Sequence, residues 1–366
     1  MVVGNIDTKD ISVVVQGAID QKYTADCLKS IRKYLPGSEI ILSTWEGSNV
    51  NRLDYDVLVL NKDPGSNDLI RKYITSHINN VNRELTSSYN GFCKASKKYG
   101  LKLRSDMIIK GISFLKYYSK FGNSNIQNSY FKQRILFNEQ TIVNIPYILG
   151  DWWCFGLAFD LKEYYNIPLY NYKLSEEYFL VKKNYNKRPK LADVITRYIP
   201  EQWFVIQNIL KFDKDINYEH FYDINNINLN KSINFILNNT ILLEDYLSNI
   251  ILPKYLNVNN PTSNHYRLTF LKWYNLCLQN NIRLPNLNIY NKFQLEIQYK
   301  LIDIQFNSFW NIKNHIYIVR NYFKYTNIIK YTTNFDISNK DITFIIYDES
   351  KDINIYKEYL LFIRQY

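Results

Sequence analysis

The sequence predicts an α/β fold: a Rossmann-type, mostly parallel sheet, followed by a mainly helical C-terminal region. Two observations support this prediction. Short β-branched runs alternate with segments of helical periodicity over the first hundred residues. Strands that alternate with helices form βαβ units, whose helices cover both faces of a parallel sheet.

Four strands are expected in this first part of the chain, with helices between them. The strands are predicted at 11–17, 39–45, 56–61 and 100–106. Apolar spacing predicts helices near 28–35, where Pro36 and Gly37 follow, and over 81–99. Further along, the patterns predict a strand at 147–149, helices at 199–210, 268–278 and 301–325, and a strand at 341–350.

A shift in composition near residue 215 predicts two domains. Residues 1–215 are expected to form the first domain, with one half at 1–106 and another at 107–215. Residues 216–366 begin with a stretch rich in Asn and Ile and are predicted to form a mainly helical domain. No pattern in this second domain indicates its role.

The charge of the chain raises two further function classes. With 45 Lys and Arg against 34 Asp and Glu, the formal net charge is +11, which suits a nucleic acid or an anionic membrane surface. The excess is mostly lysine, and neither an arginine cluster nor a nucleic-acid-binding motif is visible. We therefore expect no nucleic-acid partner, while a peripheral contact with the inner membrane stays compatible with the charge.

Cysteines and histidines form no metal-binding or disulfide pattern. The four cysteines lie far apart and never in a C-x-x-C pair, and the four histidines are equally scattered. No secretory signal is visible at the start, and no run reaches the roughly 20 apolar residues of a membrane-spanning helix. A cytoplasmic protein is expected.

Most residues at the carboxyl ends of the predicted strands of the first half are polar or charged. Ligands of open α/β sheets bind beyond the carboxyl ends of the strands, so these residues predict a ligand site. They are Gln16, Gly17, Ser43, Trp45, Asp63, Arg104 and Asp106.

Several segments together resemble a known family. STWEG and DPGS follow two of the strands, and NNVNR precedes the LRSD that ends the fourth. ISVVVQG precedes these segments and PEQWF follows them. Together, over about the first 210 residues, they resemble the WavE lipopolysaccharide-synthesis family of bacterial glycosyltransferases. The resemblance implies a fold similar to GT-A glycosyltransferases. It also implies transfer of a sugar from a nucleotide-sugar donor to lipopolysaccharide, lipooligosaccharide or capsule. Residues 1–215 would then be the catalytic domain, with a nucleotide-binding half at 1–106 and an acceptor half at 107–215.

Each residue of the expected donor site has a role in that chemistry and an ordinary structural alternative. The turn at Gln16 and Gly17 lets the backbone approach a base or ribose, and Ser43 lies at the same edge of the sheet. Trp45 can stack on the base or fill the core. Asp63 can accept a hydrogen bond from the base or ribose, or it only initiates a turn. Asn82 and Arg83 can contact the diphosphate, or they belong to a solvated helix face.

LRSD leaves the metal question open. Enzymes of this fold often carry a D-x-D motif here, which binds Mg²⁺ or Mn²⁺ at the diphosphate. This chain has only Asp106 in that register, with Arg104 two residues before it. Either Asp106 binds the ion with help from water and phosphate, or Arg104 supplies the positive charge itself.

Two carboxylates are candidates for the catalytic base. An inverting transfer needs a base for the acceptor hydroxyl. Asp151 is the first candidate, because Trp152 and Trp153 beside it can form an apolar acceptor platform and raise its pKa; alternatively, they are core residues and Asp151 caps a strand. Glu201 is the second candidate, and its alternative role is the N-terminal charge of a helix.

Other functions remain open at this point. A CMP-sugar donor, as in a sialyltransferase, would need no divalent ion and would suit the absence of D-x-D. A basic nucleic-acid-binding protein and a non-catalytic assembly scaffold are the alternatives outside enzymes. The donor, the acceptor and the stereochemistry do not follow from the sequence.

Overall fold

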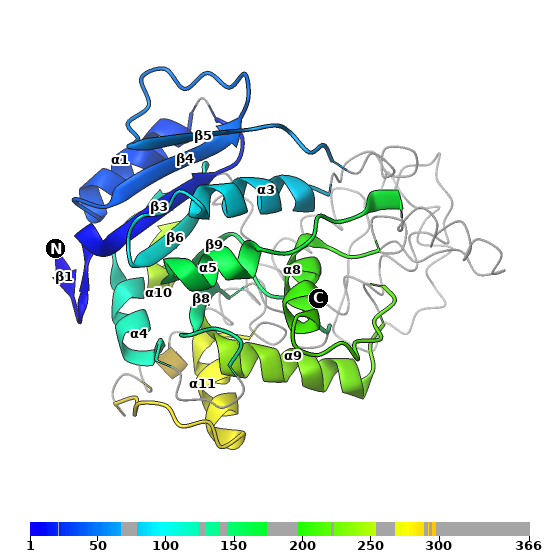
Figure 1. The fold of residues 1–366 in the computed structure, drawn as a ribbon. Helices are drawn as coiled ribbons and strands as arrows, with labels where there is room; N and C mark the ends of the chain where they lie inside the picture. The colour runs from blue at the N-terminus through cyan, green and yellow to red at the C-terminus, as the bar shows by residue number, and fades with distance from the viewer. Residues whose placement is uncertain are drawn as a thin grey trace, which may run out of the picture.

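The computed structural model describes residues 1–20, 22–66, 79–123, 129–139, 145–173, 197–220, 223–253, 268–288, 292 and 295–297. Its main strands are Ile11–Gln16 (β3), Glu39–Trp45 (β4), Val57–Asn61 (β5), Tyr99–Arg104 (β6), Ile135–Asn138 (β8), Trp153–Leu157 (β9) and Thr240–Leu243 (β10). They form one seven-stranded sheet in the order β10-β8-β9-β6-β3-β4-β5 (Figure 1). Only β9 runs antiparallel to its neighbours β6 and β8.

Helices pack around this sheet. They are Thr24–Tyr34 (α1), Val81–Phe92 (α3), Ser113–Phe121 (α4), Ala158–Tyr165 (α5), Pro200–Leu210 (α8), Asn226–Asn239 (α9), Asp245–Ser248 (α10) and Phe270–Gln279 (α11). Short elements complete the described part: Val2–Val3 (β1), Ile6–Asp7 (β2), the 3-10 helix Thr8–Asp10, Ile108–Ile109 (β7) and Ile250–Ile251 (β11).

Two neighbouring residues of β9 show that helices cover both faces. The Phe155 ring lies 5.3 Å from that of Phe114 on α4, whereas the Cys154 sulfur lies 3.5 Å from the Tyr165 hydroxyl of α5. Adjacent residues of a strand point to opposite faces, so α4 and α5 lie on opposite faces. Helix α3 shares the face of α5, because Lys102, which is in register with Cys154, contacts α3.

The predicted α/β class and mostly parallel sheet are confirmed. The four strands expected in the first half correspond to β3, β4, β5 and β6, and all four are parallel. One predicted helix is too long, because α3 ends at Phe92 and Tyr99 is the first residue of β6. Tyr99 is buried there as part of the sheet, so its place in the apolar spacing does not reflect a helix.

The predicted strand at 147–149 is wrong. Tyr147 has a φ of +68°, a left-handed conformation that an extended strand cannot contain. Its backbone N–H donates to Ser232 and its hydroxyl to Asn228, both on α9. The strand instead begins at Trp153 and ends at Leu157.

The sheet crosses the domain boundary predicted at residue 215. Strand β10 pairs with β8 in parallel, from Thr240 opposite Ile135 to Leu243 opposite Asn138. One hydrophobic cluster runs from Ile6 to Leu295. Residue 215 therefore does not separate two cores within the described part of the chain. The elements predicted at 301–325 and 341–350 lie outside the described residues.

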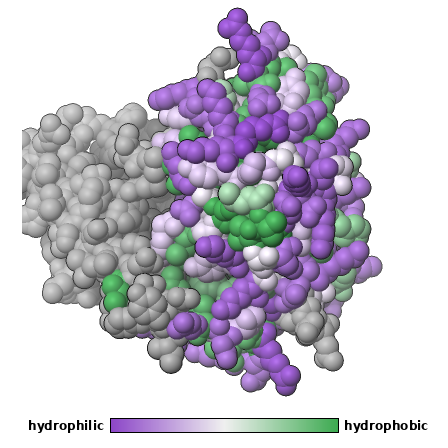
Figure 2. Space-filling view, turned by 90° about the vertical axis from the view of Figure 1, so that its left-hand side faces the viewer, coloured by the Kyte–Doolittle hydropathy of each residue, from purple (hydrophilic) through white to green (hydrophobic). Residues whose placement is uncertain are grey.

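Among the described residues visible in Figure 2, most are hydrophilic, and hydrophobic side chains form one compact patch near the centre and smaller patches elsewhere. Helix α1 illustrates the rule that apolar residues point inward: Cys27, Leu28 and Ile31 are buried on one side of it. Among the described helices, none is both long and apolar enough to span a membrane.

Candidate functional site

The carboxyl ends of four parallel strands bring several predicted site residues to one edge of the sheet. Gln16 of β3 is in register with Ser43 of β4 on one side and with Arg104 of β6 on the other. Trp45 ends β4, and Asp63 follows two residues after the end of β5. This edge is where α/β sheets bind their ligands.

The turn after β3 is fixed against the end of β6. The Ser105 N–H donates to the Gln16 carbonyl at 2.9 Å, and the Ser105 hydroxyl to the Ala18 carbonyl at 2.5 Å. Gly17 has a φ of +110°, which favours glycine. The Gly17 N–H donates to the Ser43 carbonyl at 3.1 Å, so the turn is held from both neighbouring strands.

Arg104 and Asp106 form a bidentate ion pair at this position. The Arg104 Nε and terminal nitrogen each lie 3.0 Å from an Asp106 carboxylate oxygen. Burial opposes the guanidinium charge, but the Asp106 contacts outweigh it and raise the pKa of Arg104. Asp106 itself is buried. Both carboxylate oxygens of Asp106 accept from the guanidinium, so a metal ion at Asp106 would share this carboxylate with Arg104.

A second charged group lies beside this pair and was not predicted. The ammonium of Lys102, on β6, donates to a carboxylate oxygen of Glu84 on α3 and to the backbone carbonyl of Asp151. Lys102 is fully buried. Because an ammonium in the interior must be paired, Lys102 holds α3 and the segment before β9 together.

Three carboxylates surround this lysine. Burial raises the pKa of Asp151 well above its ordinary value, and the charges of Glu84 and Glu201 raise it further. Burial also raises the pKa of Glu201, to about 7, with Glu84 again contributing. Glu201 lies in the first turn of α8 and is half-buried, whereas the Asp151 residue is only 7% exposed.

The ion pair and the carboxylates form one site. The charges of Glu84 and Asp151 also raise the pKa of Arg104, so these groups share one electrostatic environment. The structure therefore brings together six groups: Gln16, Arg104 and Asp106 with Glu84, Asp151 and Glu201. We call them the edge site.

Two predicted donor-site side chains take part in a polar network beneath α3. Gln16 Oε1 accepts from the Ser87 hydroxyl at 2.7 Å, and the Ser43 hydroxyl donates to the Ser87 carbonyl at 2.7 Å. The Asn61 amide donates to the Ser43 hydroxyl at 2.9 Å and accepts from Asn90. The Ser43 side chain thus connects the sheet to α3 and is fully buried.

Three further predicted residues form hydrogen bonds or ion pairs with other parts of the chain. The Asn82 amide donates to the Tyr170 carbonyl at 3.0 Å and accepts from the Tyr170 N–H at 2.7 Å. Arg83 forms a bidentate pair with Asp63, at 2.8 and 2.6 Å. This contact lowers the pKa of Asp63. A donor would therefore meet Asp63 and Arg83 as a neutral pair.

The three predicted tryptophans differ in exposure. Trp45 and Trp152 are half-buried. The backbone N–H of Trp152 donates to the side-chain oxygen of Asn138 at 3.1 Å. Trp153 is fully buried and packs near Phe114, with ring centroids 6.2 Å apart. Trp152 can contribute to an acceptor surface as the structure stands, whereas Trp153 would first have to leave the core.

The sequence carried a signal for the residues that were missed. Lys102 lies between Leu101 and Leu103 in a buried strand. A lysine in such a strand requires a partner for its charge in the interior. The partner, Glu84, lies 18 positions earlier on α3. Nothing in the local pattern marks Glu84, because its role depends on the packing of α3 on the sheet.

Within the described residues, no group of three or more His, Cys, Asp or Glu side chains is arranged to hold a metal ion. All four cysteines are free thiols, in agreement with their scattered positions in the sequence.

Comparison with known protein families gives a match. The model of a family described as WavE lipopolysaccharide synthesis matches residues 11–305, which include both the edge site and β10. The chain belongs to the WavE family. Membership implies a role in lipopolysaccharide synthesis, and the match extends well beyond the first 210 residues on which the sequence resemblance rested. A search of the curated proteins found no match.

Proposed function

We propose that this WavE chain is a glycosyltransferase with a GT-A-like fold that transfers a sugar from a nucleotide-sugar donor to a bacterial surface glycan. The observation that carries this proposal is the edge site itself. A cation for phosphate, Arg104, lies beside carboxylates of raised pKa at the carboxyl edge of a mostly parallel sheet. Group transfer from a nucleotide needs both kinds of group close together.

The donor end of the site lies at β3 and β6. The Gly17 turn offers a backbone surface without a side chain, and Arg104 supplies a planar donor group suited to phosphate oxygens. Binding of a phosphate would share the Arg104 guanidinium with Asp106. Trp45 and the Asp63–Arg83 pair lie further along the same edge, where a base or ribose would extend.

For the base, the electrostatics favour Glu201 over Asp151. A general base works best with a pKa near the operating pH, and the pKa of Glu201 is raised to about 7. The pKa of Asp151 is raised well above its ordinary value, so Asp151 holds a proton more firmly. Glu201 is also the more exposed of the two. In this proposal Glu201 takes the acceptor proton, Asp151 and Glu84 tune it, and Trp152 faces the acceptor. An enzyme that retains configuration would not need this base.

The pairing of Arg104 with Asp106 favours a second candidate donor. A CMP-sugar carries one phosphate and needs no divalent ion. Because Asp106 is already paired with Arg104, a sialyltransferase-type reaction with such a donor fits this site as well as one with a diphosphate donor. A glycan or glycolipid acceptor and a position at the cytoplasmic face of the inner membrane complete the proposal.

A thermal-shift screen against UDP, GDP, CMP and dTDP, each with and without Mn²⁺, tests the proposal. We expect one nucleotide to raise the melting temperature. Arg104→Ala should weaken its binding by about tenfold to a hundredfold, since a hydrogen bond to a charged group contributes about 1.5–3 kcal/mol. If no nucleotide stabilises the chain, the proposed donor site is wrong.

A matched control exists for this variant. Arg32 pairs with Asp54 and Asp56, and its side chain is 29% exposed against 33% for Arg104. Arg32→Ala should lower stability without changing nucleotide binding. Equal losses of binding in both variants would indicate a general effect on folding instead of a phosphate contact.

A further inference from the structure

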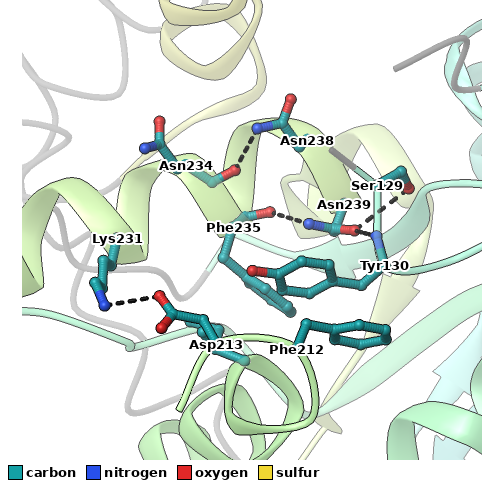
Figure 3. Close-up of a pocket in the computed structure, with 10 residues that line it drawn as sticks. Ser129, Tyr130, Phe212, Asp213, Lys231, Asn234, Phe235, Asn238 and Asn239 are labelled. Atoms are coloured by element: carbon teal, nitrogen blue, oxygen red, sulfur yellow. Dashed lines mark hydrogen bonds and ion pairs between the residues drawn. The ribbon is translucent and has the colours of Figure 1, made fainter. Parts of the chain in front are cut away.

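A cavity of about 500 Å³ lies away from the edge site, between the segment before β8, the end of α8 and one side of α9 (Figure 3). Tyr130 precedes β8, and Asn239 directly precedes β10. Both therefore lie at the amino ends of these strands, whereas the edge site lies at the carboxyl ends. The two are separated by at least the length of β8, roughly 13 Å at about 3.3 Å per residue.

An aromatic pair forms one wall of the cavity. The rings of Tyr130 and Phe212 stack with centroids 4.4 Å apart and an interplanar angle of 17°. Tyr130 also contacts Phe235, at 5.7 Å. Phe212 is nevertheless 60% exposed, although Ile209, three positions earlier, is buried. A large exposed ring held in a fixed orientation offers a flat apolar surface to a ligand.

Amides and one ion pair also line the cavity. Asn234 and Asn238 project from α9 (Figure 3), and the Asn234 side-chain amide makes no hydrogen bond within the described part of the chain. Lys231 pairs with Asp213 at 2.7 Å. The ionisable lining residues thus include one cation and one anion, and their charges cancel.

This combination selects a class of ligand. Amides both donate and accept hydrogen bonds, as the hydroxyl groups of a sugar do, and the C–H face of a sugar ring packs on an aromatic ring. A phosphate or nucleotide would require surplus positive charge, which the paired Lys231 does not provide. A purely apolar ligand that covered the Asn234 amide would leave this amide without a polar partner.

We propose that this cavity is a second carbohydrate-binding site, which holds a part of the acceptor glycan remote from the sugar that reacts. That the bound glycan is an acceptor rests on the proposed function; the binding of carbohydrate does not. Helix α8 carries Glu201 in its first turn and leads to Phe212 just beyond its end, so one helix fixes the distance between the two sites. At about 1.5 Å per residue, this distance is roughly 16 Å along the helix axis.

Saturation-transfer NMR on the full chain tests the proposal, with deacylated lipooligosaccharide and a set of methyl glycosides as probes. We expect binding to the wild type that becomes about tenfold weaker in Phe212→Ala, the loss typical of a truncated aromatic anchor. Asn234→Ala should weaken binding less. Phe159→Ala is the matched control, because Phe159 is 54% exposed and lies outside the cavity; it should bind as the wild type does.

Melting temperature and nucleotide binding of the same variants complete the experiment. We expect nucleotide binding to be unchanged in Phe212→Ala and Asn234→Ala. Glycan binding that depends on Phe212 in a chain that binds no nucleotide would support this site and reject the proposed transferase. The absence of glycan binding to the wild type, or equal binding to wild type and folded Phe212→Ala and Asn234→Ala variants, would overturn the proposal.

Discussion

Lys102 is the residue on which the charges of the edge site depend. Its ammonium is buried and paired with Glu84, and it also donates to the Asp151 carbonyl. Breaking a buried pair by removing one partner leaves an uncompensated charge, which is strongly destabilising. Lys102 therefore allows Glu84 to lie beside Asp151 and Glu201, and that proximity contributes to the raised pKa of both.

The raised pKa of Asp151 predicts a cost in stability. A carboxyl whose pKa is higher in the folded than in the unfolded state contributes stability at pH values below the unfolded pKa, and this contribution is lost as pH rises toward the folded pKa. Asp151→Asn removes the titration, so we expect the variant to melt at a higher temperature than the wild type at pH 7 and above. The difference should shrink as the pH falls toward 4. A variant that melts lower at every pH would show that packing, and not charge, dominates at this position.

Glu201 predicts a pH dependence of the reaction. If Glu201 is the base, transfer should increase as the pH rises through about 7, where Glu201 loses its proton. Glu201→Gln should lower the rate by about 10²–10⁴-fold, the range for loss of a general base, and should remove this rise. Rates measured from pH 5.5 to 8.5 in both proteins provide the test. An unchanged profile in a folded Glu201→Gln variant would return Asp151 to the role of base.

At the scale of elements, the sequence predicts strands well where an apolar run is continuous. Strands β3, β4 and β5 each contain at least three consecutive apolar residues, and such runs are recognisable without the structure. Residues 147–149 form an equally apolar run, but Tyr147 takes its left-handed conformation from contacts with α9, about 80 positions later. No local pattern contains that information.

The candidate site was predictable to a similar extent. The position of Gln16, Arg104 and Asp106 at one edge of the sheet is predictable because parallel strands end at one edge, a rule that needs only the strand positions. The surroundings of these residues are not: Asp106 is paired with Arg104, and Glu84 reaches the site from α3. Side-chain partners across elements depend on how helices dock, which the spacing of residues within one element does not specify.

Asn82 provides a test of helix docking. Its amide forms both a donor and an acceptor bond with the Tyr170 backbone and thereby joins α3 to the segment after α5. Asn82→Ala leaves two backbone groups unpaired, so we expect it to lower the free energy of unfolding by about 1–3 kcal/mol. Urea denaturation of the variant measures this loss.

Nucleotide binding by the same variant separates this docking role from the diphosphate contact that the sequence predicted for Asn82. The folded Asn82→Ala chain should still bind the nucleotide identified in the thermal-shift screen. Unchanged stability together with lost nucleotide binding would assign Asn82 to the donor instead.

At the scale of the whole molecule, residues on both sides of position 215 share one sheet and one hydrophobic cluster. Helix α9 buries Phe235, Ile236 and Leu237, and the chain then enters β10 without interruption. The edge site and the carbohydrate cavity are therefore attached to the same rigid element, since β8 contributes to the sheet between them. Such an arrangement keeps the spacing of two binding sites constant, which a flexible link between two domains would not do.

This continuity predicts that α9 and β10 unfold together with β8. Amide hydrogens that exchange only through global unfolding report the free energy of unfolding of the whole domain. The amide hydrogens of a separate domain would report the free energy of unfolding of that domain alone. In hydrogen-exchange measurements on the full chain, the slowest amides of α9 and β10 should have the same free energy of opening as those of β8. Low concentrations of urea should lower these values with the same slope, because the slope reports the surface exposed on opening. If the amides of α9 and β10 exchange with a clearly lower free energy of opening and a smaller dependence on urea, the chain divides into two domains at residue 215. The sheet would then not fix the spacing between the edge site and the carbohydrate cavity.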